Sequence, residues 1–373
     1  MKISVVLVDD WELRGDGSGD MERIQFAPLS SMLQIYESYG LRASINAEVM
    51  QQIHHIRYGE KFQNLAALAE RWEQVVTDAY TRGHDVQLHV HSQWEGARYE
   101  GGKWVLPGNW SILASTRNIM ARMIRESRTY LEGLLRKVSA DYRCVSFRSG
   151  AWAIAPNQDI LSVLVEEGIV FDMSIVPGIR FNNSVISLDY TQCEETFLPY
   201  YPRMTDARLI SDKKEPLICV PTVSFVPSRY SLVKQDLRRV LGRLQKALQP
   251  SIPKARGLSS APSGDDYQVW SRGVRHRIMK LCVPKVTIAD LSALTFDMMK
   301  EMISVIRRKS AASGRAAVPV ILENHTKDIT DFSDIERFAH YISRQDDIEV
   351  ITLKEVALRL QEGSYAVLKK GLS

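Results

Sequence analysis

Short apolar runs alternate with amphipathic segments along most of the chain, and this alternation limits the fold more than any other feature. Residues 3–8, 85–91 and 318–323 have the length and apolar pattern of strands. Residues 65–80 and 116–138 carry apolar side chains at helical spacing. Repeated strand–helix units predict a parallel sheet, open or closed into a barrel. Further strands are predicted at 42–46, 143–147, 169–175, 217–225 and 348–352, and further helices at 158–167, 294–309, 335–343 and 353–361.

The domain organisation follows from the length and from one interruption of this pattern. A chain of 373 residues suits two ordinary domains or one large barrel. The pattern stops at about 227–280, where residues 234–248 predict a basic helix and residues 249–265 are rich in Pro, Ser and Gly. We therefore expect one domain over residues 1–373, with a basic helical and loop insertion at about 227–280.

The charge distribution excludes a strongly basic nucleic-acid-binding body. The formal net charge is +4. Residues 231–280 hold eleven Lys or Arg and three Asp or Glu, so the rest of the chain sums to −4. We expect no nucleic-acid partner. The basic segment is either a solvated face or a contact for an anionic glycan or membrane surface.

The sequence also predicts the cellular location of the protein. No run approaches the roughly 18 apolar residues of a membrane span. The first ten residues lack the long apolar stretch and the cleavage site of a signal peptide. The four cysteines form no CxxC pair, which is typical of reduced thiols. We expect a cytoplasmic protein without a transmembrane segment, with peripheral contact to the inner membrane as an option.

Polar residues gather at the predicted carboxyl ends of the strands, where parallel α/β folds place their active sites. These residues are Asp9, Asp10, His89, His91, Arg148, Asp172 and His325.

His89 and His91 lie two residues apart, so on a strand both imidazoles point to one face. Two imidazoles and a carboxylate suit Zn²⁺ or another divalent transition metal. The alternative is a strand end that carries two exposed polar residues. Asp10 and His325, at the ends of other strands, favour the metal site. On a regular strand Asp9 and Asp10 would project in opposite directions, and at a frayed end they can take separate roles.

Five segments, in chain order, resemble the motifs of the polysaccharide deacetylase family, also called the NodB-homology or carbohydrate esterase 4 group. They are LVDDWE, QLHVHSQW, FRSGAWAI, FDMSI and VILENH. The resemblance covers about residues 2–360. It implies a distorted (β/α)7 barrel that removes N- or O-acyl groups from sugars with one divalent metal ion. Zinc is the expected metal, with Co, Fe, Ni and Mn as alternatives.

The resemblance implies a role for each residue of the first two motifs. Asp9 resembles the catalytic base and Asp10 the metal-binding carboxylate. His89 resembles the first metal-binding histidine. The usual second histidine lies four residues further on, where this chain has Gln93. His91 is the expected substitute.

The remaining motifs supply the other catalytic residues. Arg148 resembles the arginine that holds the base. Asp172 resembles the carboxylate that polarises the catalytic histidine, and His325 resembles that histidine, the general acid.

The third and fifth motifs also imply contacts with the substrate. The backbone N–H of Ala151 would lie at the oxyanion position, and Trp152 would shape the pocket for the acylated sugar. Leu322 falls near the apolar position that contacts the acyl methyl group.

Together these features predict a metal-dependent hydrolase that removes an acetyl or formyl group from a sugar nitrogen. The substrate would be an acylated sugar, an oligosaccharide or a nucleotide- or lipid-linked glycan precursor. The expected pathway is the synthesis of a bacterial surface polysaccharide such as O-antigen. Two alternatives stay open: a metal-dependent amidohydrolase acting on a non-sugar C–N bond, and a non-catalytic glycan-binding protein.

Overall fold

A computed structural model describes residues 1–107, 110–183, 186–235 and 286–371 of the chain. Most of the predicted insertion, including most of the basic helix and the whole Pro/Ser/Gly-rich stretch, lies outside the described residues. Within them, no helix is long and apolar enough to cross a membrane. Cys144, Cys193 and Cys219 are free thiols.

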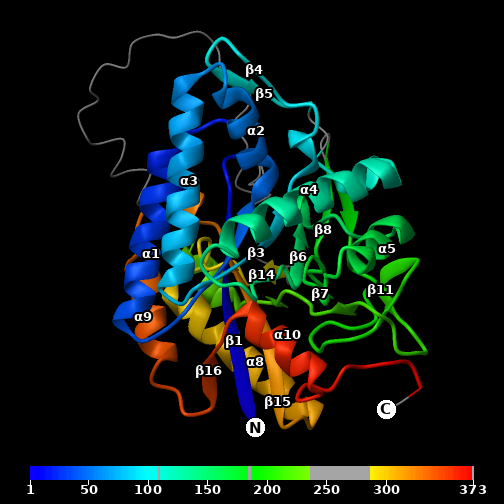
Figure 1. Cartoon of the computed structure of the whole chain (residues 1–373). Helices are drawn as coiled ribbons and strands as arrows, with labels where there is room; N and C mark the ends of the chain where they lie inside the picture. Colours follow the sequence, from blue (N-terminus) through cyan, green and yellow to red (C-terminus); the bar gives the residue numbers. More distant parts are fainter. Residues whose placement is uncertain (108–109, 184–185, 236–285, 372–373) are drawn as a thin grey trace.

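The described residues form a parallel sheet in which seven strands follow the order β12–β7–β6–β3–β2–β1–β15, and β16 pairs with the first half of β1 (Figure 1). The strands are β1 (Lys2–Trp11), β2 (Ser44–Glu48), β3 (Asp85–Val90), β6 (Ser146–Ser149), β7 (Phe171–Asp172), β12 (Ile218–Cys219), β15 (Ala317–Asn324) and β16 (Ile348–Val350).

The segment after β12 joins the two edges of this sheet. The N–H of Val220 donates to the carbonyl of Asp172 in β7 (2.9 Å), and the N–H of Val223 donates to the carbonyl of Ile321 in β15 (3.0 Å). Thr222 forms a parallel bridge with Ile321. The curled sheet therefore closes through an irregular segment, which confirms the predicted distorted seven-stranded barrel.

Helices cover the outside of the barrel, as the strand–helix alternation predicts (Figure 1). They are α1 (Ala27–Ser38), α2 (Val49–Gly59), α3 (Gln63–Thr81), α4 (Arg117–Leu135), α5 (Gln158–Glu166), α8 (Phe296–Ser313), α9 (Ser333–Ile342) and α10 (Leu353–Gln361). The pattern did not predict four antiparallel strand pairs, which are β4 (Arg98–Glu100) with β5 (Lys103–Val105), β8 (Arg180–Asn182) with β9 (Ser187–Asp189), β10 (Pro202–Arg203) with β11 (Asp206–Ile210), and β13 (Ser224–Phe225) with β14 (Thr287–Ile288).

Alternation along β1 separates two buried faces. Val5 and Leu7 pack into the core shared with the outer helices, whereas Val6 and Val8 belong to a second cluster that includes Ile321 and residues of α10. The helix α10 closes the amino-terminal end of the barrel. Its first N–H groups donate to Ser44 Oγ (3.0 Å) and Asp85 Oδ2 (2.8 Å), where β2 and β3 begin. The carboxyl end of the barrel carries the polar residues.

Candidate metal and catalytic centre

The end of β1 presents Asp10 and Glu12 to the barrel interior and Asp9 to the opposite face. Asp10 accepts hydrogen bonds from Asn46 Nδ2 (2.8 Å) and Arg148 (3.1 and 3.2 Å). Glu12 contacts both His89 and His91. These residues are buried, and their side chains follow the two-residue period of the strand.

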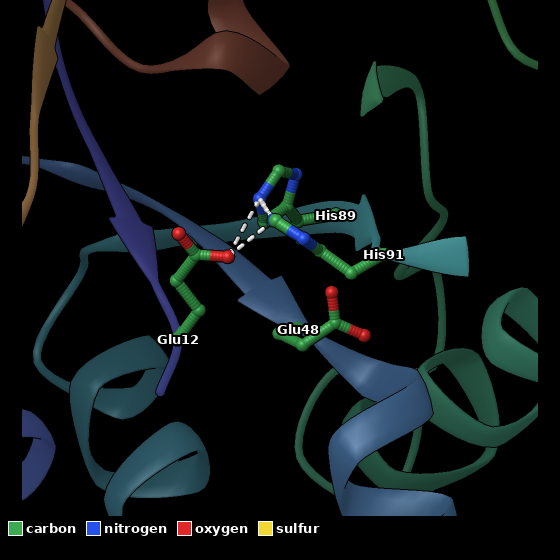
Figure 2. A group of neighbouring side chains, drawn as sticks. All are labelled: Glu12, Glu48, His89 and His91. Atoms are coloured by element: carbon green, nitrogen blue, oxygen red, sulfur yellow. Dashed lines mark hydrogen bonds and ion pairs between the residues drawn. The ribbon is translucent and has the colours of Figure 1, made fainter. Parts of the chain in front are cut away.

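A group of four buried side chains has the composition of a metal site. Glu12 directly follows β1 and Glu48 ends β2. His89 lies in β3 and His91 directly follows it, and the four side chains gather in one group (Figure 2). Their ligand atoms all lie within 4.8 Å of one another. The Nε2 atoms of the two imidazoles are 3.0 Å apart, and His89 Nε2 lies 3.4 Å from Glu12 Oε2. The donor set fits a divalent ion.

Each of the two imidazoles also makes a contact through its Nδ1 atom. His89 Nδ1 lies 2.8 Å from the backbone carbonyl of Arg148, and His91 Nδ1 lies 2.8 Å from Gln93 Nε2. The carbonyl of Arg148 accepts the Nδ1 proton of His89, which leaves His89 Nε2 free to bind an ion. Gln93, at the position of the usual second histidine, therefore contacts the His91 ring and lies outside the ligand group.

A second buried group adjoins the first. The Arg148 guanidinium bridges Asp10 and Glu323 Oε2 (2.9 Å) and also donates to Thr222 Oγ1 (2.8 Å). His325 lies close to these ion pairs, and its Nε2 atom is 3.9 Å from Asp10 Oδ2. The structure thus brings Asp10, Arg148 and His325 together, as the sequence predicts.

The carboxylate that holds His325 is Asp290. His325 Nδ1 lies 3.0 Å from Asp290 Oδ2 and 3.6 Å from Glu323 Oε1. Burial alone would lower the pKa of His325, but the Asp290 and Glu323 carboxylates outweigh it and raise that pKa to about 10. The imidazole is therefore cationic at neutral pH.

The two carboxylates on the interior face of β1 are ionised. Burial opposes ionisation of Asp10, but Arg148 and His89 keep its pKa below the ordinary value. Burial likewise opposes ionisation of Glu12, and His91 and Lys327 hold its pKa well below the usual range. Lys327 forms a buried ion pair with Glu12. Asp10 and Glu12 are therefore charged acceptors, whereas burial raises the pKa of Glu48 to about 8 and that of Glu323 to about 7.

The structure places Asp9 apart from this centre. Its Oδ1 accepts hydrogen bonds from the N–H of Thr326 (2.9 Å) and from Asn324 Nδ2 (2.5 Å), and its Oδ2 from Thr326 Oγ1 (2.9 Å). Burial raises the pKa of Asp9 to about 7. Arg148, which the resemblance assigned to hold the base, contacts Asp10 instead of Asp9.

Asp172 and Leu322 also lie outside the centre. Asp172 accepts hydrogen bonds from the Oγ (2.6 Å) and N–H (3.0 Å) of Ser174, and the ion pairs of His325 are with other carboxylates. Leu322 lies in the core that packs against the outer helices, because it alternates with Ile321 along β15. The predicted contact of Leu322 with an acyl group is not supported by this orientation.

Ala151 and Trp152 lie beside the second group. Both adopt positive φ angles, 52° and 56°, which are strained for residues other than Gly and concentrate at functional sites. Trp152 Nε1 donates to Glu323 Oε2 (2.8 Å), and its ring packs edge-on against His325. This turn follows β6 directly and faces the predicted reaction site.

Sequence reasoning missed Glu12, Glu48 and Asp290, and considered Glu323 only as a residue flanking His325 that either binds substrate or is solvated. Glu12 carried a usable signal, since it lies two residues after Asp10 and so shares its face of the strand. Glu323 carried the same signal, two residues before His325.

No protein-family model and no curated protein sequence matches the chain. Solved structures do match it. A protein from Mycobacterium smegmatis assigned to the polysaccharide deacetylases superposes with a TM-score of 0.50 at 12% identity, over 100% of this chain and 94% of its own. PuuE allantoinase gives a TM-score of 0.49 at 11% identity, covering 96% and 90% of the two chains. A Pseudomonas aeruginosa protein assigned to the polysaccharide deacetylases gives 0.46 at 12% identity, covering 96% and 91%.

The fold is that of the polysaccharide deacetylases. The deacetylase-like barrel confirms the architecture that the five motifs implied. Because one fold supports several chemistries, the activity depends on the side chains at the carboxyl end of the barrel.

Proposed function

We propose that the protein is a divalent-metal-dependent hydrolase that removes an N-acyl group, acetyl or formyl, from a sugar. One observation carries the proposal. At the carboxyl end of the deacetylase-like barrel, a buried group of imidazoles and carboxylates adjoins a carboxylate held by Arg148 and an imidazole held by Asp290. A metal site, a base and an acid thus lie side by side.

Glu12, His89 and His91 would hold the metal ion. Glu12 takes the part that the motif resemblance gave to Asp10, because its carboxylate contacts both imidazoles. When bound, a divalent ion supplies Lewis acidity, which polarises the acyl carbonyl and acidifies water.

Asp10 is the proposed general base, in place of Asp9. Its carboxylate is ionised, lies on the interior face and is oriented by Arg148 and Asn46. It is therefore placed to accept a proton from the attacking water.

His325 is the proposed general acid. Asp290 holds its Nδ1, which leaves Nε2 directed towards Asp10 and the reaction site. The cationic imidazole would give its Nε2 proton to the departing amine. The backbone N–H of Ala151 as oxyanion donor and the Trp152 side chain as pocket wall remain predictions.

The pH profile should distinguish Asp290 from Asp172 as the partner of His325. Replacing Asp290 with Asn removes a carboxylate that raises the pKa of His325, so the loss of activity at high pH should begin at lower pH. An opposite charge at this distance shifts a pKa by about 1–3 units. Asp172→Asn is the matched control. If the loss of activity at high pH shifts in Asp172→Asn and not in Asp290→Asn, then Asp172 is the partner of His325, as the motif resemblance implied.

Gly150 leaves room for the His91 ring. A Cβ at this position would lie 2.6 Å from His91 Cγ. Gly150→Ala should therefore displace the imidazole and weaken metal binding about 10- to 100-fold, as loss of a supporting contact does in other metal sites. Gly133→Ala is the control, because a Cβ there meets no atom within 4 Å. Equal metal affinities for the two variants, measured by chelator competition, would contradict this placement of His91.

Released acid identifies the reaction. Purified protein, reconstituted with divalent metal, should release acetate or formate from some members of a panel of N-acylated sugars and their nucleotide- or lipid-linked forms. Non-sugar linear and cyclic amides belong in the same panel. Hydrolysis of these amides alone would favour the amidohydrolase alternative, and metal binding with no hydrolysis would favour a glycan-binding protein. A cytoplasmic precursor of a surface polysaccharide remains the predicted substrate.

A further inference from the structure

Glu48 belongs to the group in Figure 2 but lies outside the five sequence motifs. It ends β2 and forms the N-cap of α2. Its Oε1 accepts hydrogen bonds from the N–H groups of Met50 (2.9 Å) and Gln51 (3.3 Å). Its Oε2 is buried and has no hydrogen-bond partner among the described residues.

The N-cap of α2 accounts for the contacts of only one of the two Glu48 carboxyl oxygens. Ser, Thr, Asp and Asn are the preferred N-cap residues, and one acceptor oxygen is enough for the cap. A fully buried carboxylate with a bare oxygen is costly in its charged form, and burial raises the pKa of Glu48 to about 8. The ligand atom of Glu48 lies within 4.8 Å of those of Glu12, His89 and His91. A cation bound among them would satisfy it.

We propose that Glu48 is a fourth protein ligand, contributed by β2, of the divalent ion held by Glu12, His89 and His91. The inference rests on the metal site of the proposed function. One carboxylate oxygen is fixed by the start of α2, and the other binds the ion. The backbone carbonyl of Arg148 fixes His89 in the same way, at the atom that does not bind.

Two consequences follow for the metal. Two carboxylates neutralise the charge of a divalent ion, whereas a site with one carboxylate leaves a net charge of +1. Four protein ligands also complete a tetrahedral site, so an ion that accepts five or six ligands is needed to keep a position open for substrate. Carboxylate-rich sites favour Mn²⁺ and other hard ions over thiolate-preferring ones. The Glu48 carboxylate should therefore raise the preference for Mn²⁺ relative to Zn²⁺.

The test uses Co²⁺ as the probe, in the full-length protein. Glu48→Gln keeps the side-chain length and an oxygen for the cap but removes the anionic ligand. We expect at least about 10-fold weaker Co²⁺ binding by chelator competition, since even a lost supporting contact costs 10- to 100-fold. The visible Co²⁺ spectrum should change as well, and Mn²⁺ should lose more affinity than Zn²⁺. Thermal unfolding of the metal-free protein should stay cooperative.

Glu167→Gln is the matched control. Glu167 is also a buried carboxylate, but it pairs with Arg125 and Arg128 at the end of α5. Its variant should keep the wild-type Co²⁺ affinity and spectrum. If Glu48→Gln fails to fold, Glu48→Asp keeps the charge and the cap but withdraws the oxygen from the ion, and should alter the spectrum in the same direction.

Wild-type affinity and spectrum in folded Glu48→Gln would overturn the inference and leave Glu48 as the cap of α2, with the proposed function intact. Wild-type protein that binds no Co²⁺ at all would overturn both. These two results are read from metal binding, so neither depends on knowing the substrate.

Discussion

Replacing Asp10 with Asn should lower the rate of acyl release about 10²- to 10⁴-fold, the usual contribution of a general base, while the metal stays bound. The variant keeps the shape of the side chain but loses the charge that Arg148 holds in place. Rate and metal content are measured on the same samples. Thermal unfolding shows whether the unbalanced charge of the buried Arg148 disturbs the fold.

Asp9→Asn provides the comparison, because the motif resemblance gave the role of base to Asp9. Its carboxylate accepts three hydrogen bonds from Asn324 and Thr326 on the far face of β1. The change should cost about 1–3 kcal/mol of stability through unsatisfied partners, with a much smaller loss of rate. A stable, metal-loaded Asp9→Asn protein without activity, beside an active Asp10→Asn protein, would show that Asp9 is the base.

Replacing His325 with Gln should produce a substrate-dependent loss. Hydrolysis of an N-acyl sugar needs a proton on the departing amine, so this rate should fall about 10²- to 10⁴-fold. An activated aryl ester leaves as a stable phenolate and needs no such proton, so its hydrolysis should fall far less. Asp10→Asn, by contrast, should slow both substrates alike.

Equal losses of rate on the two substrates would show that His325 is not the general acid. The imidazole would then act before the leaving group departs, by stabilising charge near Asp10 or by binding substrate. Retained metal content in this variant is part of the prediction, because the proposed ligands are Glu12, His89 and His91. Loss of the metal would instead assign an ion to Asp10, Glu323 and His325, whose ligand atoms also lie within 4.8 Å of one another.

The sequence predicts the barrel well because its evidence is periodic. Apolar strands that alternate with amphipathic helices leave few arrangements, and the predicted elements match those of the structure in order, with shifted ends. β1, for example, extends from Lys2 to Trp11, beyond the predicted residues 3–8. The segment predicted at 217–225 instead divides into β12 and β13, because it leaves β7 and crosses to β15.

Strand geometry and motif order select partly different residues for the site. His89 and His91 share a face because two residues separate them, and the structure places them together. The same rule selects Asp10 and Glu12 on β1, whereas motif order selected Asp9. Asp290 carries no such signal, since it follows a strand of only two residues just beyond the aperiodic insertion.

Metal content and acid release, measured on the same samples, show whether this centre works as a metal-dependent hydrolase. Wild-type protein and the His89→Ala/His91→Ala double variant would be purified in parallel and reconstituted with divalent metal. Mass spectrometry would give the metal content, and the acylated sugars would serve as substrates for acid release. We predict about one metal ion per wild-type chain, and the loss of both metal and acid release in the double variant. A double variant that keeps the metal and the activity of the wild type would contradict the proposed site.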